Sequence, residues 1–169
     1  ATGIGTQHGG ILVDFNAVKG GIEIIPLDND WQRAAHVYSD EVLISHRTDA
    51  EKGTPKFERG KSLSDHQQEM IYISGTAAIR GEESIVTGDV LVQTEITLEN
   101  LIGLEEGREK LPEHSGKLEL LRVYLKHEED AKIVKEDMDK LCPDVPIVYL
   151  YADVCREELL VEIEGIAYL

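Results

Sequence analysis

Two glutamates near the C-terminus have a spacing suited to acid catalysis. Glu162 and Glu164 alternate with apolar residues in the run Leu159–Ile166, and this alternation predicts a β-strand. Residues two apart on a strand point to the same face, so the two carboxyl groups lie side by side next to apolar neighbours. Repulsion and desolvation then raise their pKa values, and a carboxyl that is protonated near neutral pH can serve as a general acid. The alternative is a solvated pair that binds Arg122 and Lys126.

Positive groups that could bind an anionic substrate lie on a preceding predicted strand. Alternation places three side chains on one of its faces: Arg122, Tyr124 and Lys126. They could form a cationic wall in an otherwise acidic protein, or they could be an ordinary solvated strand face. Arg59 and Arg156 are additional candidates for the same role.

Other residues could complete a pocket. Tyr149 and Tyr151 share one face of their strand and could form the floor beneath a planar ring, or could be half-buried in a sheet. Ser74 and Gly75 follow a strand and could donate hydrogen bonds to a ligand carboxylate, or form a turn that ends the strand.

Cys155 precedes an arginine, which could lower the pKa of its thiol and make it reactive; the alternative is a small buried apolar residue. With only Cys142 as a second cysteine, we expect reduced thiols in a cytosolic protein. Neither cysteine has a partner at zinc-binding spacing, and the histidines are scattered. We therefore expect neither a metal site nor a cofactor.

The elements that position these residues follow a strand, helix, strand, helix, strand, strand order. This order predicts an α+β fold in which two helices pack on one face of a sheet. The predicted elements are a strand Met70–Ser74 that Gly75 ends, a helix 89–106 capped by Asp89, a strand Leu118–Lys126, a helix 128–141, and strands Pro146–Ala152 and Leu159–Leu169.

The N-terminal third of the chain does not follow this order of strands and helices. Gly10–Val18 and Ile22–Leu27 predict a β-hairpin, whereas residues 28–64 are polar and irregular. Ile11–Val18 also resembles Leu159–Ile166, which suggests a duplication, unless the two strands share a composition by chance. We therefore predict that residues 1–27 end a missing N-terminal copy of the domain, that 28–64 are a linker or insertion, and that 65–169 form the domain.

Composition limits the partners. The 169 residues include 17 Lys and Arg against 33 Asp and Glu, which gives a formal net charge of −16. Such a surface repels phosphate backbones and anionic membranes, so we expect neither as a partner. No apolar run approaches the roughly 18 residues of a membrane-spanning helix.

From Met70 onward the chain resembles the Rid (YjgF, L-PSP endoribonuclease-like) family. The resemblance rests on segments in a shared order: Ile73–Gly75, Gly88–Asp89, Gln93–Thr94, Leu98–Asn100, Val123–Leu125 and Val161–Ala167. It implies a chorismate-mutase-like (YjgF-like) mixed sheet with two helices on one face. It also implies a homotrimer or pseudo-trimer with ligand clefts between units. Translation inhibition and RNA cleavage, which the family is often labelled with, have little support in a chain this acidic.

A narrower resemblance is to chorismatases, which look like two fused Rid-type domains. It rests on Asn29–Arg33, Tyr38, Pro55–Arg59, Ala152–Arg156 and Leu159–Glu162. It implies that Glu162 is an acid that protonates the vinyl carbon of an enol ether such as chorismate. It also places Cys155 where some chorismatases shape the product.

The chain departs from both families at informative positions. Ile147 stands where Rid deaminases hold the substrate carboxylate with an arginine, and Gly53 and Lys126 stand where chorismatases favour arginine. We therefore predict a cofactor-free lyase or hydrolase, cytoplasmic and acting on a small carboxylated metabolite. The alternative is a non-catalytic ligand-binding or assembly module with a degenerate site.

Overall fold

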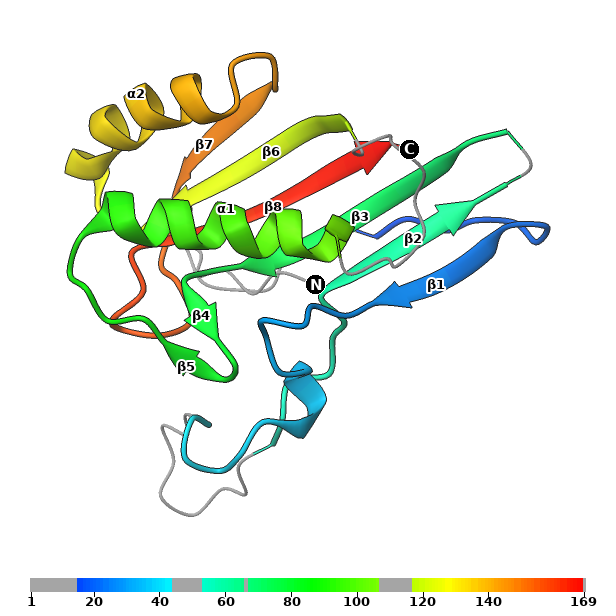
Figure 1. Cartoon of the computed structure of the whole chain (residues 1–169), viewed down its shortest axis with the longest axis horizontal. Helices are drawn as coiled ribbons and strands as arrows, with labels where there is room; N and C mark the ends of the chain where they lie inside the picture. The colour runs from blue at the N-terminus through cyan, green and yellow to red at the C-terminus, as the bar shows by residue number, and fades with distance from the viewer. Residues whose placement is uncertain (1–14, 44–52, 66, 107–116, 169) are drawn as a thin grey trace.

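A mixed six-stranded sheet forms the body of the protein in the computed structural model, which describes residues 15–43, 53–65, 67–106 and 117–168. Both α-helices lie over the same face of this sheet, so the predicted α+β fold is confirmed (Figure 1). Neighbouring strands are antiparallel except β6 and β7, which run parallel. The strand order across the sheet is β1 (Glu23–Leu27), β2 (Gly60–Ser64), β3 (Glu69–Thr76), β8 (Val161–Tyr168), β6 (Lys117–Leu125) and β7 (Ile147–Tyr151).

The helices begin close to where the sequence predicts. Helix α1 (Val90–Glu106) follows Asp89, whose Oδ1 accepts hydrogen bonds from the amides of Leu91 (2.9 Å) and Val92 (3.4 Å), as expected of an N-cap. A short 3-10 turn, η2 (Glu128–Asp130), leads into α2 (Ala131–Leu141). Helix α2 buries two side chains completely in the core, Val134 and Met138.

Alternate side chains of β8 point to opposite faces of the sheet, one facing the core and the other facing the candidate site. Val161, Ile163 and Ala167 are fully buried in the cluster beneath the helices, so Glu162 and Glu164 belong to the opposite face of the sheet. The strand lies very close to β6, because a methyl group added at Gly165 would come within 2.8 Å of a Leu121 side-chain carbon. Tight packing on one face thus fixes where the two carboxylates point.

A small second sheet sits beside the end of β3. It is the hairpin of β4 (Ile79–Arg80) and β5 (Glu83–Ser84), and its turn contains Gly81 with a φ of +58°, a conformation that favours glycine. Ala77, Ala78 and Ile79 pack with Val154 and Leu159 in a minor core cluster. This cluster joins the hairpin to the loop that precedes β8.

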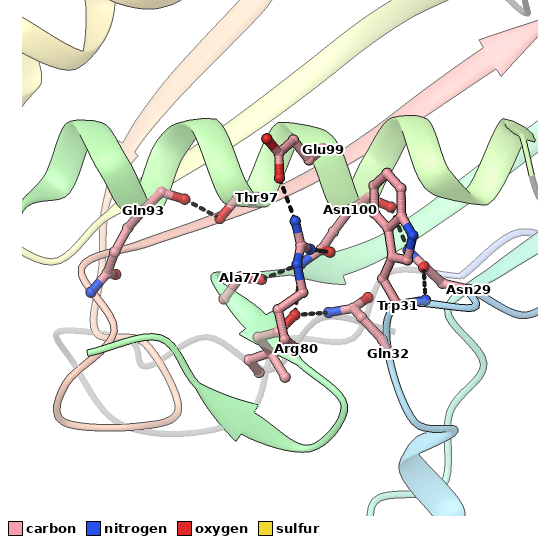
Figure 2. A network of polar contacts seen from close by, with 10 residues as sticks. Asn29, Trp31, Gln32, Ala77, Arg80, Gln93, Thr97, Glu99 and Asn100 are labelled. Atoms are coloured by element: carbon pink, nitrogen blue, oxygen red, sulfur yellow. Dashed lines mark hydrogen bonds and ion pairs between the residues drawn. The ribbon is translucent and has the colours of Figure 1, made fainter. Parts of the chain in front are cut away.

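The segment 28–43, predicted to be irregular, is fixed by contacts within the chain (Figure 2). Asn29 Nδ2 donates to the Asn100 carbonyl of α1 at 2.7 Å, and Asn29 Oδ1 accepts from the Trp31 amide at 2.8 Å. Arg80 contacts the Asn100 side chain and lies 5.0 Å from the Trp31 ring centroid. The segment then forms a 3-10 turn, η1 (Ala35–Val37).

Gln93 of α1 holds the chain where it enters β8. Its Nε2 donates to the Glu158 carbonyl at 2.9 Å, and its Oε1 accepts from the Leu160 amide at 2.8 Å. The side chain is fully buried, so both contacts are shielded from water. Gln93 therefore orients the turn that delivers Glu162.

Three details differ from the sequence predictions. Gly75 lies inside β3, which runs on to Thr76 past an irregularity in the pairing with β8. Strand β2 lies within the predicted linker, and it is the partner of β1, whereas residues 15–18 form no strand. Polar alternation in Gly60–Ser64 gives no apolar signal, which is why this strand is missed. Residues 10–14 of the predicted hairpin, and with them half of the repeated run 11–18, lie outside the described residues.

Candidate functional site

A cavity of about 460 Å³ opens where β3 ends and β8 begins. It lies between the minor cluster around the β4–β5 hairpin and another formed by Ala35, Tyr38 and Leu43. Segments far apart in the sequence therefore supply its wall: Tyr38, Val42, Leu43, Gly53, Pro55, Lys56, Phe57, Arg59, Gly75, Ala77, Ile79, Cys155, Arg156 and Glu162.

Glu162 provides the acidic group of this cavity. The residue is 5% exposed, and within the described part of the chain its carboxyl forms no hydrogen bond or ion pair. Burial, followed by the nearby charge of Glu164, raises its pKa from 4.5 to about 7. Near neutral pH a large fraction of Glu162 is therefore protonated and can donate a proton.

Two buried arginines face the same space. Arg59 is 3% exposed and Arg156 is 8% exposed, and neither forms an ion pair with a carboxylate of the described residues. Arg59 Nη2 donates to the Arg33 carbonyl at 2.8 Å, while its buried Nε has no hydrogen-bond partner in this part of the chain. Buried guanidinium groups without a carboxylate are well suited to an anionic ligand.

Aromatic rings arrange these guanidinium groups. The Arg59 and Arg156 guanidinium carbons lie 5.5 Å and 5.7 Å from the centroid of the Tyr38 ring, and Phe57 is 5.4 Å from Arg59. Arg59 also donates a hydrogen bond to the Tyr38 hydroxyl. The cavity therefore combines an apolar and aromatic wall, two cations and one protonatable acid.

Arg122 and Tyr124, two residues of the expected cationic wall, bind a carboxylate of the protein itself. The strand register places Arg122 opposite Glu164 and Tyr124 opposite Glu162. Glu164 Oε1 accepts from Arg122 Nε at 2.8 Å and from the Tyr124 hydroxyl at 2.7 Å. Desolvation and this hydrogen bond raise the pKa of Tyr124 to about 12. Neither residue lines the cavity, because their polar groups are engaged by Glu164.

Lys126 supports the site from outside the cavity. Its Nζ donates to the carbonyl oxygens of Glu157 (2.8 Å) and Arg156 (3.3 Å), and it lies 3.7 Å from an Asp153 carboxylate oxygen. The lysine therefore holds the loop that carries Arg156, instead of facing a ligand as the sequence suggested.

Tyr149 and Tyr151 do not form a pocket floor. Both lie on β7, at the edge of the sheet away from the cavity, and neither lines it. Tyr149 packs against the core, and desolvation is the main cause that raises its pKa to about 12. Tyr151 is 55% exposed.

Of the remaining predicted site residues, some line the cavity and others do not. Gly75 and Cys155 line the cavity, whereas Ser74 lines a separate hollow and its Oγ donates to the Glu58 carbonyl at 2.7 Å. The pKa of the Cys155 thiol is raised by desolvation and by the Glu162 charge, against a smaller opposing effect of Arg156. Of the two interpretations of Cys155, a net lowering of the thiol pKa by the neighbouring arginine does not apply.

The sequence reasoning did not single out the aromatic residues of the cavity. Tyr38 and Phe57 come from the polar segments that were interpreted as a linker. In the sequence analysis, Tyr38 and the run Pro55–Arg59 served only as support for the resemblance to chorismatases. No group of three His, Cys, Asp or Glu side chains among the described residues could hold a metal ion.

Comparison with solved structures first defines the class of fold. A member of the YjgF/YER057c/UK114 family from Mycobacterium tuberculosis matches 67% of this chain and 86% of its own, with a TM-score of 0.52 and 17% identity. A chorismatase crystal structure matches 86% of this chain and 44% of its own, with a TM-score of 0.72 and 26% identity. The fold is therefore the YjgF-like α+β fold.

Sequence comparison then gives the particular resemblance. A chorismatase of Streptomyces rapamycinicus and a 3-hydroxybenzoate synthase of Streptomyces hygroscopicus are each 32% identical to this chain over 98% of its length. The chain spans about half the length of these relatives (50% and 49%). The predicted resemblance to Rid proteins, and within them to one half of a chorismatase, is thus confirmed. No protein-family model matches the chain.

Proposed function

We propose that this chain supplies the acid and the anion-binding groups of a cofactor-free hydrolase or lyase that acts on a small carboxylated metabolite. The observation that carries the proposal is the position of Glu162, with its raised pKa, in the same cavity as Arg59 and Arg156. The names of the relatives, chorismatase and 3-hydroxybenzoate synthase, support an enol ether such as chorismate as the substrate.

In the proposed reaction, the guanidinium groups of Arg59 and Arg156 bind substrate carboxylates by charge-assisted hydrogen bonds. Protonated Glu162 gives its proton to the terminal vinyl carbon of the enol ether, and the adjacent ether carbon becomes cationic. Water adds to that carbon and loses a proton to the Glu162 carboxylate. The hemiketal then breaks down to pyruvate and an alcohol. The net reaction consumes one water molecule, and Glu162 regains its proton.

Glu162→Gln is the direct test. The amide keeps the shape of the side chain but cannot donate a proton of suitable acidity, so pyruvate release from chorismate should fall by about 10² to 10⁴-fold. The rate of the unsubstituted protein should decrease as the pH rises through about 7, because the acid form of Glu162 disappears. A coupled pyruvate assay measures both effects.

Glu164→Gln is the matched control, since Glu164 is engaged by Arg122 and Tyr124 outside the cavity. It should retain activity and shift the descending limb of the pH profile to lower pH, because a charge that raises the Glu162 pKa is removed. If the unsubstituted protein releases no more pyruvate than Glu162→Gln, the catalytic proposal for this substrate is abandoned.

One observation favours the alternative of a binding module. Ile147, at the position where Rid deaminases use an arginine, packs against the main core and does not line the cavity. Binding of chorismate without pyruvate release would support that alternative. Because Ile147 cannot bind a substrate carboxylate as that arginine does, we do not propose deaminase chemistry of the Rid type.

We also propose that the cavity is used in an assembly of Rid-like units, as a homotrimer or a pseudo-trimer. The support comes from the face of the sheet opposite the helices, where Val148 and Leu150 have 45% and 37% of their surface exposed. A cytoplasmic location is supported by the two cysteines, which form no disulfide.

A further inference from the structure

The turn of the β4–β5 hairpin binds the segment that carries Tyr38. Glu82 Oε2 accepts from the Ser39 amide at 2.7 Å, and its Oε1 accepts from the Ser39 hydroxyl at 2.6 Å. Arg33 Nη1 lies 3.2 Å from the same carboxylate. The Ser39 hydrogen bonds are the main cause that lowers the pKa of Glu82, so its carboxylate is ionised when it makes these contacts.

The same turn binds one of the two cavity arginines. Arg156 Nη1 donates to the Glu82 carbonyl at 3.0 Å and to the Ser84 hydroxyl at 2.9 Å. The turn therefore holds the Arg156 guanidinium through its backbone and Ser84, and holds Ser39 through the Glu82 side chain. Two segments that contribute Tyr38 and Arg156 to the cavity wall therefore meet on one short loop.

Tyr38, the residue before Ser39, connects this turn to the second arginine. Its hydroxyl accepts a hydrogen bond from Arg59, and its ring lies next to both guanidinium groups. A displacement of Ser39 would therefore move the ring that contacts both guanidinium groups. The Glu82 carboxylate is thus linked through Ser39 and Tyr38 to the two guanidinium groups that would bind an anion.

The backbone near this contact has its own anchors. The Arg33 amide donates to the Gly81 carbonyl at 2.7 Å, and the Gly81 amide donates to the Trp31 carbonyl at 2.8 Å. These bonds do not involve the Glu82 side chain. Removal of the Glu82 carboxylate should thus release Ser39 and Tyr38 while leaving the segment attached to the hairpin.

We propose that Glu82 is a positioning residue for the site: by holding Ser39 it fixes Tyr38, and through Tyr38 it sets the placement of Arg59 and Arg156 for binding substrate carboxylates. This inference rests on the proposed function for its role with substrate, but the placement of the arginines can be tested without any ligand.

The ligand-free test observes the arginine Nε–H signals by NMR in protein labelled at arginine. Arg59→Lys and Arg156→Lys assign the two signals of interest. Glu82→Ala should shift both signals and speed their exchange with water, because the Tyr38 ring that contacts both guanidinium groups is released. Glu83→Ala is the control, since Glu83 is exposed on the neighbouring position of the same hairpin. Unchanged Arg59 and Arg156 signals in Glu82→Ala would overturn the proposal.

The second test uses chorismate turnover, if the unsubstituted protein shows it. Glu82→Ala should raise KM about tenfold, the effect of losing one charge-assisted contact, and leave kcat unchanged because Glu162 is untouched. Glu82→Gln should give a smaller rise, since its amide can still accept from the Ser39 amide. A fall in kcat with unchanged KM would contradict a positioning role. Absence of turnover in the unsubstituted protein would count against the proposed function, and the NMR result would then decide the role of Glu82 alone.

Discussion

At the scale of single residues, environment distinguishes two glutamates that the sequence presents as equivalent. Glu164 shares its Oε1 between Arg122 and Tyr124, whereas Glu162 is buried in the cavity without a described partner. Desolvation without compensation favours the protonated form of Glu162. The division of roles between an acid and a structural carboxylate therefore follows from the partners that Glu164 binds and that Glu162 lacks among the described residues.

The raised pKa of Glu162 makes folding stability depend on pH. The carboxyl titrates at about 7 in the folded chain and near 4.5 when unfolded, so the folded state binds the extra proton between these values. Stability from this group is fully present below pH 4.5 and is lost as the pH rises through 7, by up to about 3 kcal/mol. Glu162→Gln should therefore raise the free energy of unfolding at pH 8 but leave it unchanged at pH 4.

Urea unfolding at the two pH values checks this expectation. Glu95→Gln is a suitable control, because Glu95 is exposed on α1 and its substitution should have little effect at either pH. An equal gain in stability at pH 4 and pH 8 would mean that the buried charge is not the cause.

The sequence predicted single-residue chemistry only in part. Alternation placed Glu162 and Glu164 on one face of β8, and that was correct. Alternation could not decide whether Arg122 and Tyr124 face a substrate or a carboxylate of the chain; in the structure both bind Glu164. Arg59 and Arg156 both contact the Tyr38 ring only through the tertiary fold, and no local pattern encodes such a contact.

At the scale of elements, helix α1 organises the site through side chains that face away from the main core. Asn100 binds the carbonyls of Ala77 (Figure 2) and Ile79, each at 3.0 Å. Gln93 binds the chain on either side of Leu159. One helix therefore fixes both the β3–β4 connection and the entry to β8. The sequence predicted this helix well, because its Asp89 cap and apolar spacing are local signals.

The docking of Trp31 on α1 can be tested at Gly103. Glycine within a helix costs about 1 kcal/mol relative to alanine, so Gly103→Ala alone would normally stabilise the protein. Here the added methyl group would lie 3.1 Å from a ring carbon of Trp31, which is tighter than ordinary contact. We expect Gly103→Ala to bring no net gain in the free energy of unfolding.

In a Trp31→Ala background the obstacle is absent, and Gly103→Ala should then stabilise by about 1 kcal/mol. Unfolding of the four proteins, followed by circular dichroism, gives the coupling between the two sites. If the two substitutions are additive, Trp31 does not pack on Gly103.

At the scale of the whole molecule, the two faces of the sheet differ. The helices cover one face, whereas the other presents apolar side chains from neighbouring strands, among them Leu120 opposite Ile166, and Val148 and Leu150 on β7. Exposed apolar surface of this kind marks an interface. The net charge of −16 opposes the association of identical chains, so we expect an association that salt strengthens.

Leu150→Glu tests this expectation, because it adds a charge to the face opposite the helices without touching the cavity wall. It should shift the protein toward the monomer in sedimentation equilibrium, and added NaCl should restore association only in part. Ile133→Glu is the matched control: Ile133 is 43% exposed, but it lies on α2 on the other side of the sheet. An unsubstituted chain that stays monomeric at both low and high salt would contradict self-association through this face, and equal effects of the two substitutions would show that added charge alone prevents it.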